Sequence, residues 1–250
     1  MEAPQVLAAE GVAKRYGAVL ALGGISLDAR RGEILGLVGP NGAGKTTFLK
    51  SAVGLVRLSE GRIRIDGIDV AEDPVGVRRR TGYLPGECNL YPGMTGQTFL
   101  NFCLEGYPDA DAALRKELAE RFDLPLRKKV RKYSTGMRRK LLLIQALCLR
   151  TPLIFLDEPT ESLDPSSRIF LLGLLRRLAG EGRTIVFSSH QLDEVERICD
   201  RVALLHKGSL LDFATIESLR ERAAQLPPSA FDYRSVSLTK LYAELYGVGA

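Results

Sequence analysis

One glycine-rich segment has the residue types and the spacing for phosphate chemistry. Residues 39–46, G-P-N-G-A-G-K-T, match the pattern G-x-x-x-x-G-K-[ST] in full. Glycines at this spacing let the backbone curl so that successive N–H groups point at phosphate oxygens, and a following helix adds the positive end of its dipole. Lys45 would then reach the β- and γ-phosphates, and the Thr46 hydroxyl would ligate Mg²⁺. We therefore expect these nucleotide-binding residues: Gly39, Pro40, Asn41, Gly42, Ala43, Gly44, Lys45, Thr46 and Thr47.

A pair of acidic residues has the types needed for a metal ion and for an attacking water. Four apolar residues at 153–156 predict a buried strand, and Asp157 and Glu158 follow it directly. Ligands bind at the carboxyl ends of parallel strands, so both acids would face the same crevice as the glycine-rich segment. Asp157 suits the Mg²⁺ sphere, and Glu158 suits orienting or deprotonating water. Alone, such a pair is typical of a solvated strand end. Beside a phosphate loop, it predicts nucleotide hydrolysis.

Alternating strands and helices must position these groups. An apolar run at 33–38 predicts a buried strand that ends at the glycine-rich segment, and residues 45–53 predict the helix after it. Helical spacing dominates residues 95–149, and then the alternation resumes. The other strands are expected at 6–7, 19–27, 62–66, 153–156, 184–187 and 202–205, and the other helices at 138–149, 166–178, 191–199 and 237–246. This order predicts an α/β fold whose strand–helix series is interrupted by a helical insert.

In this order the motifs resemble those of the ATP-binding subunit of an ATP-binding cassette (ABC) transporter. Residues 133–137, Y-S-T-G-M, are similar to the family's signature, usually L-S-G-G-Q, and differ from it at three positions. In the family this loop binds the γ-phosphate held by the opposite subunit. The resemblance gives that role to Ser134, Thr135, Gly136 and Met137. Tyr16, in Lys-Arg-Tyr-Gly, is at the place of the family's aromatic residue that stacks on adenine.

Two further motifs of the family follow the acidic pair. Ser162, Leu163 and Asp164 match the D-loop, which crosses the dimer interface in the family. His190, behind the strand expected at 184–187, matches the switch histidine that hydrogen-bonds the γ-phosphate. The resemblance thus implies ATP and Mg²⁺ as cofactors. It implies Lys45, Glu158 and His190 as catalytic residues and Thr46 and Asp157 as metal ligands.

One position departs from the family's pattern. The family usually has a glutamine after Tyr-Leu-Pro, where it senses Mg²⁺ and links the site to the membrane subunit. Here residues 83–87 are Y-L-P-G-E, so Gly86 replaces that glutamine. Our hypothesis is that Glu87, or water, takes over the metal-side role.

The resemblance also implies the domain organisation. The core would be a P-loop NTPase, with a mostly parallel sheet and flanking helices, joined by an antiparallel β subdomain and the helical insert. We expect an ABC ATPase domain over 1–226 and a tail with one helix over 227–250. Within the domain, the β subdomain is expected within 1–80, the helical signature insert at about 88–150, and the catalytic core at 33–55 and 151–210.

The implied function is an ATPase subunit that powers transport through a separate membrane permease. Two subunits, copies or paralogues, would pair head to tail around two ATP molecules. The longest apolar stretch, 141–149, is about half of what spans a bilayer, so we expect peripheral attachment to the cytoplasmic side of the cell membrane through the permease. Residues 82–96 resemble cassettes of export systems more than importer cassettes, which favours export.

Two other functions fit the phosphate loop. The first is a soluble ABC-type ATPase that acts on nucleic acid or ribosomes, but such proteins add coiled coils or a second cassette. The second is a P-loop kinase, against which the motifs at Ser134 and His190 argue. Salt-sensitive binding of DNA or RNA would favour the first, and phosphoryl transfer to a small acceptor would favour the second.

Charge and composition limit the kinds of partner and metal site that the chain is expected to have. The 250 residues are 45% hydrophobic, with a formal net charge of +5 and four well-separated cysteines, which indicate reduced thiols rather than a zinc or redox site. The basic excess is local, because eight of the 35 basic residues lie near the signature. The rest of the chain has 27 basic and 30 acidic residues, which argues against a nucleic-acid partner. This stretch would be a solvated helix face, a source of positive potential at the signature, or a surface facing anionic lipid. Its members are Arg127, Lys128, Lys129, Arg131, Lys132, Arg138, Arg139 and Lys140.

Overall fold

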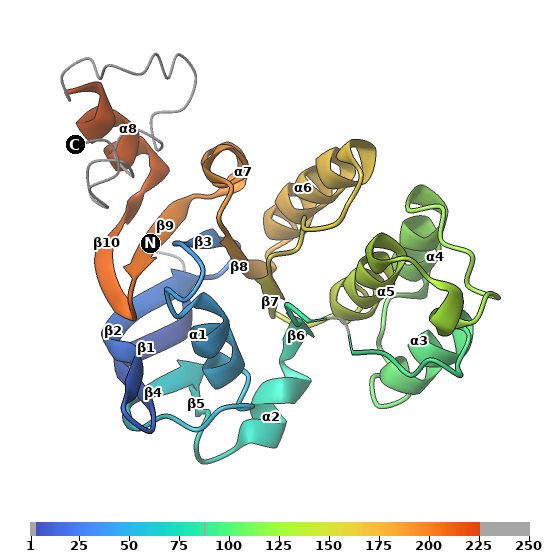
Figure 1. Cartoon of the computed structure of the whole chain (residues 1–250), viewed down its shortest axis with the longest axis horizontal. Helices are drawn as coiled ribbons and strands as arrows, with labels where there is room; N and C mark the ends of the chain where they lie inside the picture. Colours follow the sequence, from blue (N-terminus) through green and yellow to red (C-terminus); the bar gives the residue numbers. More distant parts are fainter. Residues whose placement is uncertain (1–3, 88, 226–250) are drawn as a thin grey trace.

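Two sheets frame the computed structural model, which describes residues 4–87 and 89–225 (Figure 1). The larger sheet has the order β10-β9-β3-β8-β7-β6, parallel from β9 to β6, with β10 antiparallel at one edge. The smaller sheet, β2-β1-β4-β5, is antiparallel. The strands are β1 (Gln5–Tyr16), β2 (Val19–Arg30), β3 (Ile34–Val38), β4 (Glu60–Ile65), β5 (Ile68–Asp69), β6 (Thr81–Leu84), β7 (Leu153–Asp157), β8 (Thr184–Ser189), β9 (Arg201–His206) and β10 (Ser209–Thr215). The expected fold class is confirmed.

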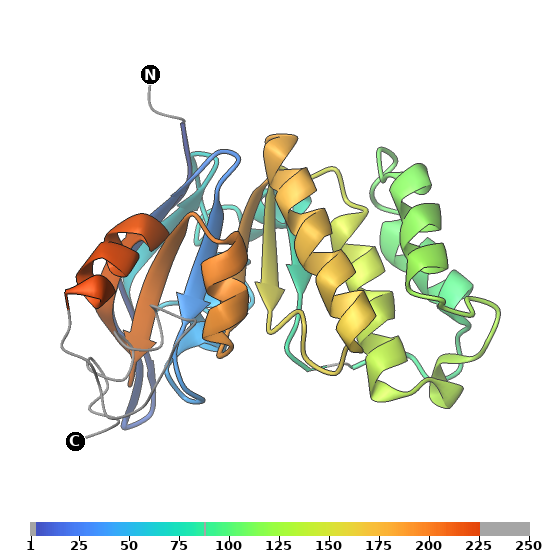
Figure 2. The ribbon, with the colours of Figure 1, turned by 90° about the horizontal axis from the view of Figure 1, so that it is seen from above.

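The inner strands β3, β7 and β8 of the larger sheet are buried along their whole length, on both faces, which explains their continuous apolar runs. On β7, Phe155 packs into one core with α1 and the smaller sheet, whereas Leu156 packs into a second core with the helices. On β3, Leu37 packs into the first of these cores and Val38 into the second. Figure 2 shows α4, α5 and α6 (green to gold) gathered on the helical side. The larger sheet therefore separates two apolar cores and carries the site at the ends of its strands.

Side-chain caps fix where most of the helices begin. The helices are α1 (Lys45–Ala52), α2 (Pro74–Arg79), α3 (Gly96–Leu104), α4 (Ala112–Arg121), α5 (Thr135–Leu147), α6 (Pro165–Gly180), α7 (Leu192–Ile198) and α8 (Ile216–Ala224). Ser134 accepts a hydrogen bond from the Met137 N–H and caps α5. This cap starts α5 three residues before the helix expected at 138–149, because a serine in this position satisfies an otherwise unpaired N–H of the first turn.

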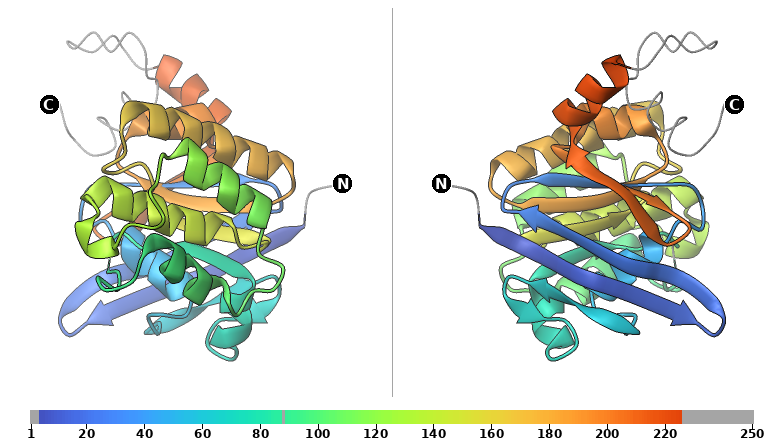
Figure 3. Two further views of the ribbon diagram at one scale, coloured as in Figure 1. Left: turned by 90° about the vertical axis from the view of Figure 1, so that its right-hand side faces the viewer. Right: turned by 90° about the vertical axis from the view of Figure 1, so that its left-hand side faces the viewer.

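The strands β1, β2 and β10 differ from the sequence expectation in length or in place. β1 and β2 each span twelve residues, longer than the strands predicted at 6–7 and 19–27. Their pairing shifts register several times, and each shift breaks the alternation from which strands are predicted. β10 extends the larger sheet past residue 210, and its turn meets the smaller sheet, because the Gly23 N–H donates to the Gly208 carbonyl at 2.8 Å (Figure 3). The helix expected at 237–246 lies outside the described residues. No helix between residues 4 and 225, Cys88 aside, is long and apolar enough to cross a membrane.

Candidate nucleotide-binding site

The glycine-rich segment connects β3 to α1, as its chemistry requires. Gly44 caps α1 with φ +104°, a conformation that favours glycine. A Cβ there would lie 2.7 Å from the Ala21 carbonyl oxygen, so the close approach to β2 also requires glycine. The first helical residue is Lys45, and the exposed Thr46 follows it. The loop thus presents backbone N–H groups and a helix N-terminus at the carboxyl end of β3.

Lys45 joins this loop to the acidic strand end. Its side chain is 6% exposed, and its Nζ donates to the carbonyls of Gly39 at 2.5 Å and Pro40 at 3.2 Å. The same ammonium lies 3.4 Å from Glu158 Oε1. A buried cation at this position can neutralise the negative charge of phosphate oxygens bound to the loop.

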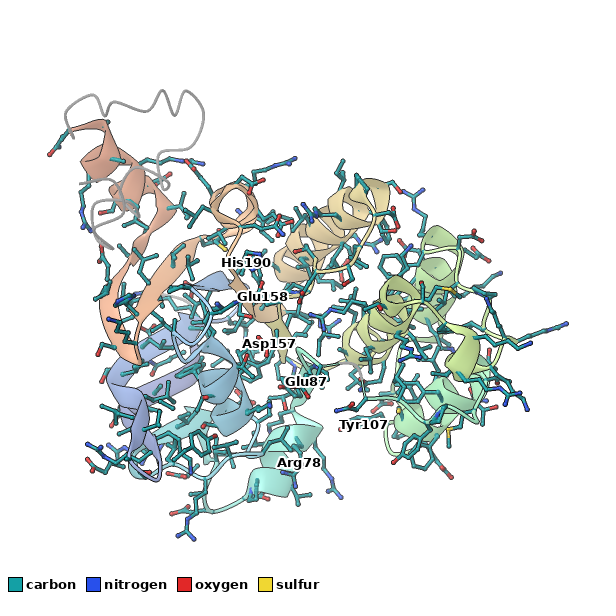
Figure 4. All side chains as sticks on the ribbon, viewed as in Figure 1. Arg78, Glu87, Tyr107, Asp157, Glu158 and His190 are labelled. Carbon is teal, nitrogen blue, oxygen red and sulfur yellow. The ribbon has the colours of Figure 1, made fainter. Side chains whose placement is uncertain are left out.

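The Glu158 carboxylate lies between the Lys45 ammonium and the His190 ring. Its Oε2 is 3.0 Å from His190 Nδ1, on the side opposite the Lys45 contact. His190 follows β8 and is half exposed, while Asp157 is buried at the end of β7 (Figure 4). The structure therefore brings together Lys45, Glu158 and His190, the three residues expected to be catalytic. Glu158 itself has φ +49°, a left-handed conformation that is uncommon for a residue other than glycine.

Ser188 was missed from the sequence and is central to this geometry. Its Oγ donates to Asp157 Oδ1 at 2.6 Å and accepts from the Glu158 N–H at 2.9 Å. Ser188 pairs with Asp157 in the parallel register of β7 and β8. The sequence did carry a signal for Ser188, which is a hydroxyl near the end of the strand that precedes His190. Because adjacent parallel strands end at the same edge of a sheet, that hydroxyl could be expected near Asp157.

The donor set at this strand end fits Mg²⁺. Asp157 Oδ2 is buried and has no hydrogen-bond partner in the part of the chain that the structure describes, which leaves a carboxylate oxygen free to ligate. The described residues hold no cluster of three or more His, Cys, Asp or Glu side chains arranged for a metal. Mg²⁺ is commonly held by one or two protein ligands together with substrate phosphates and water, so Asp157 and the Thr46 hydroxyl suffice.

The loop after β6 comes against the same carboxylate. A Cβ built on Gly86 would lie 2.9 Å from Asp157 Oδ2, so in this arrangement a larger residue at position 86 would displace one of the two groups. Glu87 is exposed on the same loop (Figure 4). Burial, together with the charge of Asp157, raises the pKa of the neighbouring Tyr83 hydroxyl, which therefore stays protonated.

A second buried carboxylate braces the segment after Glu158. Glu194 on α7 accepts from the Thr160 hydroxyl at 2.7 Å and lies 3.2 Å from Arg168. Burial raises the pKa of Glu194, and the hydrogen bond from Thr160 opposes that shift. These contacts tie the chain that leaves Glu158 to the helix that follows His190.

The signature residues contact the D-loop of the same chain. A Cβ on Gly136 would lie 2.6 Å from the Ser162 carbonyl oxygen, so the two loops touch through their backbones. Asp164 caps α6, and hydrogen bonds from the Lys140 ammonium at 2.7 Å and from the Ser167 N–H hold its pKa well below the usual range. Ser134 and Thr135 are exposed, Met137 packs at the edge of the helical core, and Leu163 is buried. Within residues 4–87 and 89–225, no hydrogen bond or ion pair joins residues 134–137 to residues 39–47.

Tyr16 ends β1 on the smaller sheet. The residue is 49% exposed, and the Lys14 ammonium lies 4.9 Å from the centroid of its ring. An exposed ring at the end of a strand offers a flat face for stacking, which is the property that the adenine role needs.

The basic stretch is not a uniform solvated surface, and one member corrects that expectation. Arg139 is 2% exposed and donates only to main-chain carbonyls within the described residues. Lys140 is half-buried and pairs with Asp164. The members that are exposed are Arg127, Lys128, Lys129, Arg131 and Lys132.

Known proteins are similar to this chain in sequence and in architecture. A family model described as ABC transporter matches residues 22–161. The linearmycin resistance ATP-binding protein LnrL of Bacillus subtilis (strain 168) is 32% identical over 222 residues, which cover 87% of this chain and 71% of that protein. A solved ATP-binding subunit of an ABC transporter has a TM-score of 0.84 and 31% identity, over 96% of this chain and 99% of that one. The dimeric post-hydrolysis cassette MJ0796, bound to ADP and Pi, shares the fold with a TM-score of 0.76 and 24% identity, over 84% of this chain and 98% of that one. The chain therefore belongs to the ABC transporter family, as one of its ATP-binding ATPase subunits.

Proposed function

We propose that this ATPase subunit dimerises around two ATP molecules and drives export through a separate membrane permease. The observation that carries the proposal is the Glu158 carboxylate, placed between Lys45 Nζ and His190 Nδ1 at the end of β7. A carboxylate in this position can accept a proton from water that attacks a phosphate bound at the α1 N-terminus.

Each site residue receives a role on this proposal. The N–H groups of residues 39–47 cradle the phosphates, Lys45 neutralises their charge, and Tyr16 stacks on adenine. His190 holds the Glu158 carboxylate in place and reaches the γ-phosphate. Thr46 and Asp157 hold Mg²⁺, with Glu87 or water in the metal-side role, and the bound ion would neutralise charge on the phosphate oxygens.

The dimer is supported by the signature loop. Ser134 caps α5 and is exposed, and it presents a hydroxyl at the N-terminal end of a thirteen-residue helix. It makes no hydrogen bond with its own phosphate loop within the described ranges, so we infer that it binds the γ-phosphate held by a second ABC ATPase subunit, a copy or a paralogue. Ser162, Leu163 and Asp164 would line the same interface. The dimeric state in the description of the MJ0796 structure agrees with this arrangement.

A membrane permease is the proposed anchor and would place the subunit at the cytoplasmic face of the cell membrane. Tyr91 and Phe102 on the helical insert are more than half exposed and pack edge to face, 6.0 Å between ring centroids. Aromatic residues are enriched in the interfaces between proteins. Export is supported by the resistance function in the name of LnrL. A co-purifying permease that depends on a binding protein would contradict export.

Glu158→Gln tests the site and the dimer together. The amide keeps the size of the side chain and cannot accept a proton, so we expect turnover to fall by about 10²–10⁴-fold while ATP still binds. In light-scattering chromatography with saturating ATP and Mg²⁺, the variant should run at about twice the monomer mass of 27.4 kDa.

The matched control is Glu161→Gln, a change of the same chemistry at an exposed acid three residues along. It should hydrolyse ATP at the wild-type rate. A Glu158→Gln variant that stays monomeric with saturating ATP would contradict a dimer of identical subunits, and one that retains turnover would contradict the role of Glu158.

A further inference from the structure

Arg139 is a buried cation whose two Nη groups serve the two loops of the site, while its Nε has no hydrogen-bond partner among the described residues. Its Nη1 donates to the carbonyls of Pro85 at 2.6 Å and Gly86 at 3.2 Å. Its Nη2 donates to the carbonyls of Asp157 and Glu158. The side chain is 2% exposed and comes from the second turn of α5. One guanidinium therefore joins the Gly86 loop, the end of β7 and the helical insert.

The two Nη2 contacts fall on both sides of one Cα atom. The Asp157 carbonyl belongs to the peptide plane before Glu158, and the Glu158 carbonyl belongs to the plane after it. Ser188 holds the first plane from the opposite side through the Glu158 N–H. Fixing both planes fixes φ and ψ of Glu158, and these two angles set the direction in which its side chain leaves the backbone.

Glu158 needs such an external constraint. Its φ of +49° is uncommon for a residue with a side chain, and conformations of this kind persist where the surroundings over-determine them. We propose that Arg139 is a positioning residue, which holds the Glu158 backbone in this conformation and so directs its carboxylate between Lys45 and His190. This inference rests on the proposed role of Glu158 as the group that activates water.

The chemistry of arginine suits this role and that of lysine does not. A planar guanidinium presents several N–H donors in a fixed fork, so it can serve carbonyls of two separate loops at once. A lysine keeps the charge but has one compact ammonium, which cannot span the same acceptors. Because α5 begins at the Ser134 cap, Arg139 also makes the placement of Glu158 depend on the helix that carries the signature loop.

The chain offers a matched arginine away from the site. Arg183 donates to three main-chain carbonyls: those of Leu147 at 2.8 Å, Leu149 at 2.6 Å and Thr151 at 3.2 Å. Burial lowers its pKa to about 10, so it too is a desolvated cation that braces loops. A purely structural role for Arg139 predicts that Arg139→Lys and Arg183→Lys behave alike.

The experiment compares Arg139→Lys, Arg139→Gln and Arg183→Lys by melting temperature, ATP affinity and kcat, well below every melting temperature. We expect both Arg139 variants to lose about 10- to 100-fold in kcat, the scale on which a misplacement of about 1 Å acts, with ATP affinity within threefold of wild type. Arg183→Lys should lower the melting temperature and leave kcat unchanged. Amide hydrogen exchange should rise at 84–87 and 157–160 in the Arg139 variants, and at 147–152 in Arg183→Lys.

Two results would overturn the inference. The first is a kcat of Arg139→Lys that lies within twofold of the wild-type value. A loss of kcat in Arg139→Lys that equals the loss in Arg183→Lys, when both variants lose the same melting temperature, would count in the same way. The second is failure of both Arg139 variants to fold, because Arg139 would then be needed for folding itself.

Glu158→Gln, assayed in parallel, separates the proposal for Arg139 from the proposed function. If it retains turnover, the role of Glu158 is wrong. If it is inactive while Arg139→Lys is fully active, only the role of Arg139 is wrong.

Discussion

Replacing Ser188 with alanine should destabilise the protein more than any ordinary serine substitution. Ser188 is fully buried, and its hydroxyl makes two hydrogen bonds at the acidic strand end. One is donated to the Asp157 carboxylate at 2.6 Å, and the other is accepted from the Glu158 N–H at 2.9 Å. Alanine removes both and leaves Asp157 Oδ1 unpaired beside an Oδ2 that already has no partner in the described residues.

The magnitude follows from these two bonds. A hydrogen bond to a charged group contributes about 1.5–3 kcal/mol, and a buried donor left unpaired costs about 1–3 kcal/mol. The Glu158 N–H is only partly buried, so its share lies at the lower end, and we expect the free energy of unfolding to fall by about 3 kcal/mol in total. For a chain of this size, such a loss corresponds to a melting temperature lower by about 6–12 °C.

The assay is thermal and urea unfolding of Ser188→Ala beside a matched control, Ser51→Ala. Ser51 is 1% exposed, and its hydroxyl has no hydrogen-bond partner among the described residues. Its replacement should therefore leave stability unchanged or raise it, because no bond is lost. Ser188→Thr, which keeps the hydroxyl, should recover part of the loss. A Ser188→Ala protein as stable as wild type, or a Ser51→Ala protein destabilised to the same extent, would refute the reasoning.

Two further predictions concern a thiol and the loop after β6. Burial raises the pKa of Cys148 to about 12, so in a Cys88→Ser background at pH 8 its thiolate fraction is about 10⁻⁴ and we expect it to react with a disulfide reagent only at the rate of unfolding. Half-buried Cys103 should react sooner, and rapid labelling of Cys148 in the native protein would contradict this. Glu87→Ala should raise the Mg²⁺ concentration for half-maximal ATPase activity by about tenfold, the loss expected when a metal-side group is removed. An unchanged Mg²⁺ dependence would leave water as the metal-side group.

The parts of the site that lie in one contiguous segment were predictable. The loop at 39–46 and the pair Asp157 and Glu158 carry their chemistry in residue types at fixed spacing, next to apolar runs that predict their strands. The structure places Lys45, Glu158 and His190 in contact, as the motif order implied. The lengths of β1 and β2 were not predictable, because register shifts in their pairing break the alternation on which strand prediction depends.

The sequence by itself determined the fold class, the phosphate loop and the acidic strand end, because local spacing and the order of motifs are enough to specify them. Only the tertiary structure decided the roles of Ser188 and Arg139. Ser188 meets Asp157 through the register of β7 and β8, and Arg139 reaches Pro85 across 54 positions of the chain. A solvated helix face was one of three alternatives for the basic stretch, and it does not hold for Arg139, which is buried and donates through its Nη groups to main-chain carbonyls. Carbonyls are identical at every residue, so no side-chain pattern marks where they converge. That convergence is set by how the helical insert packs on the larger sheet.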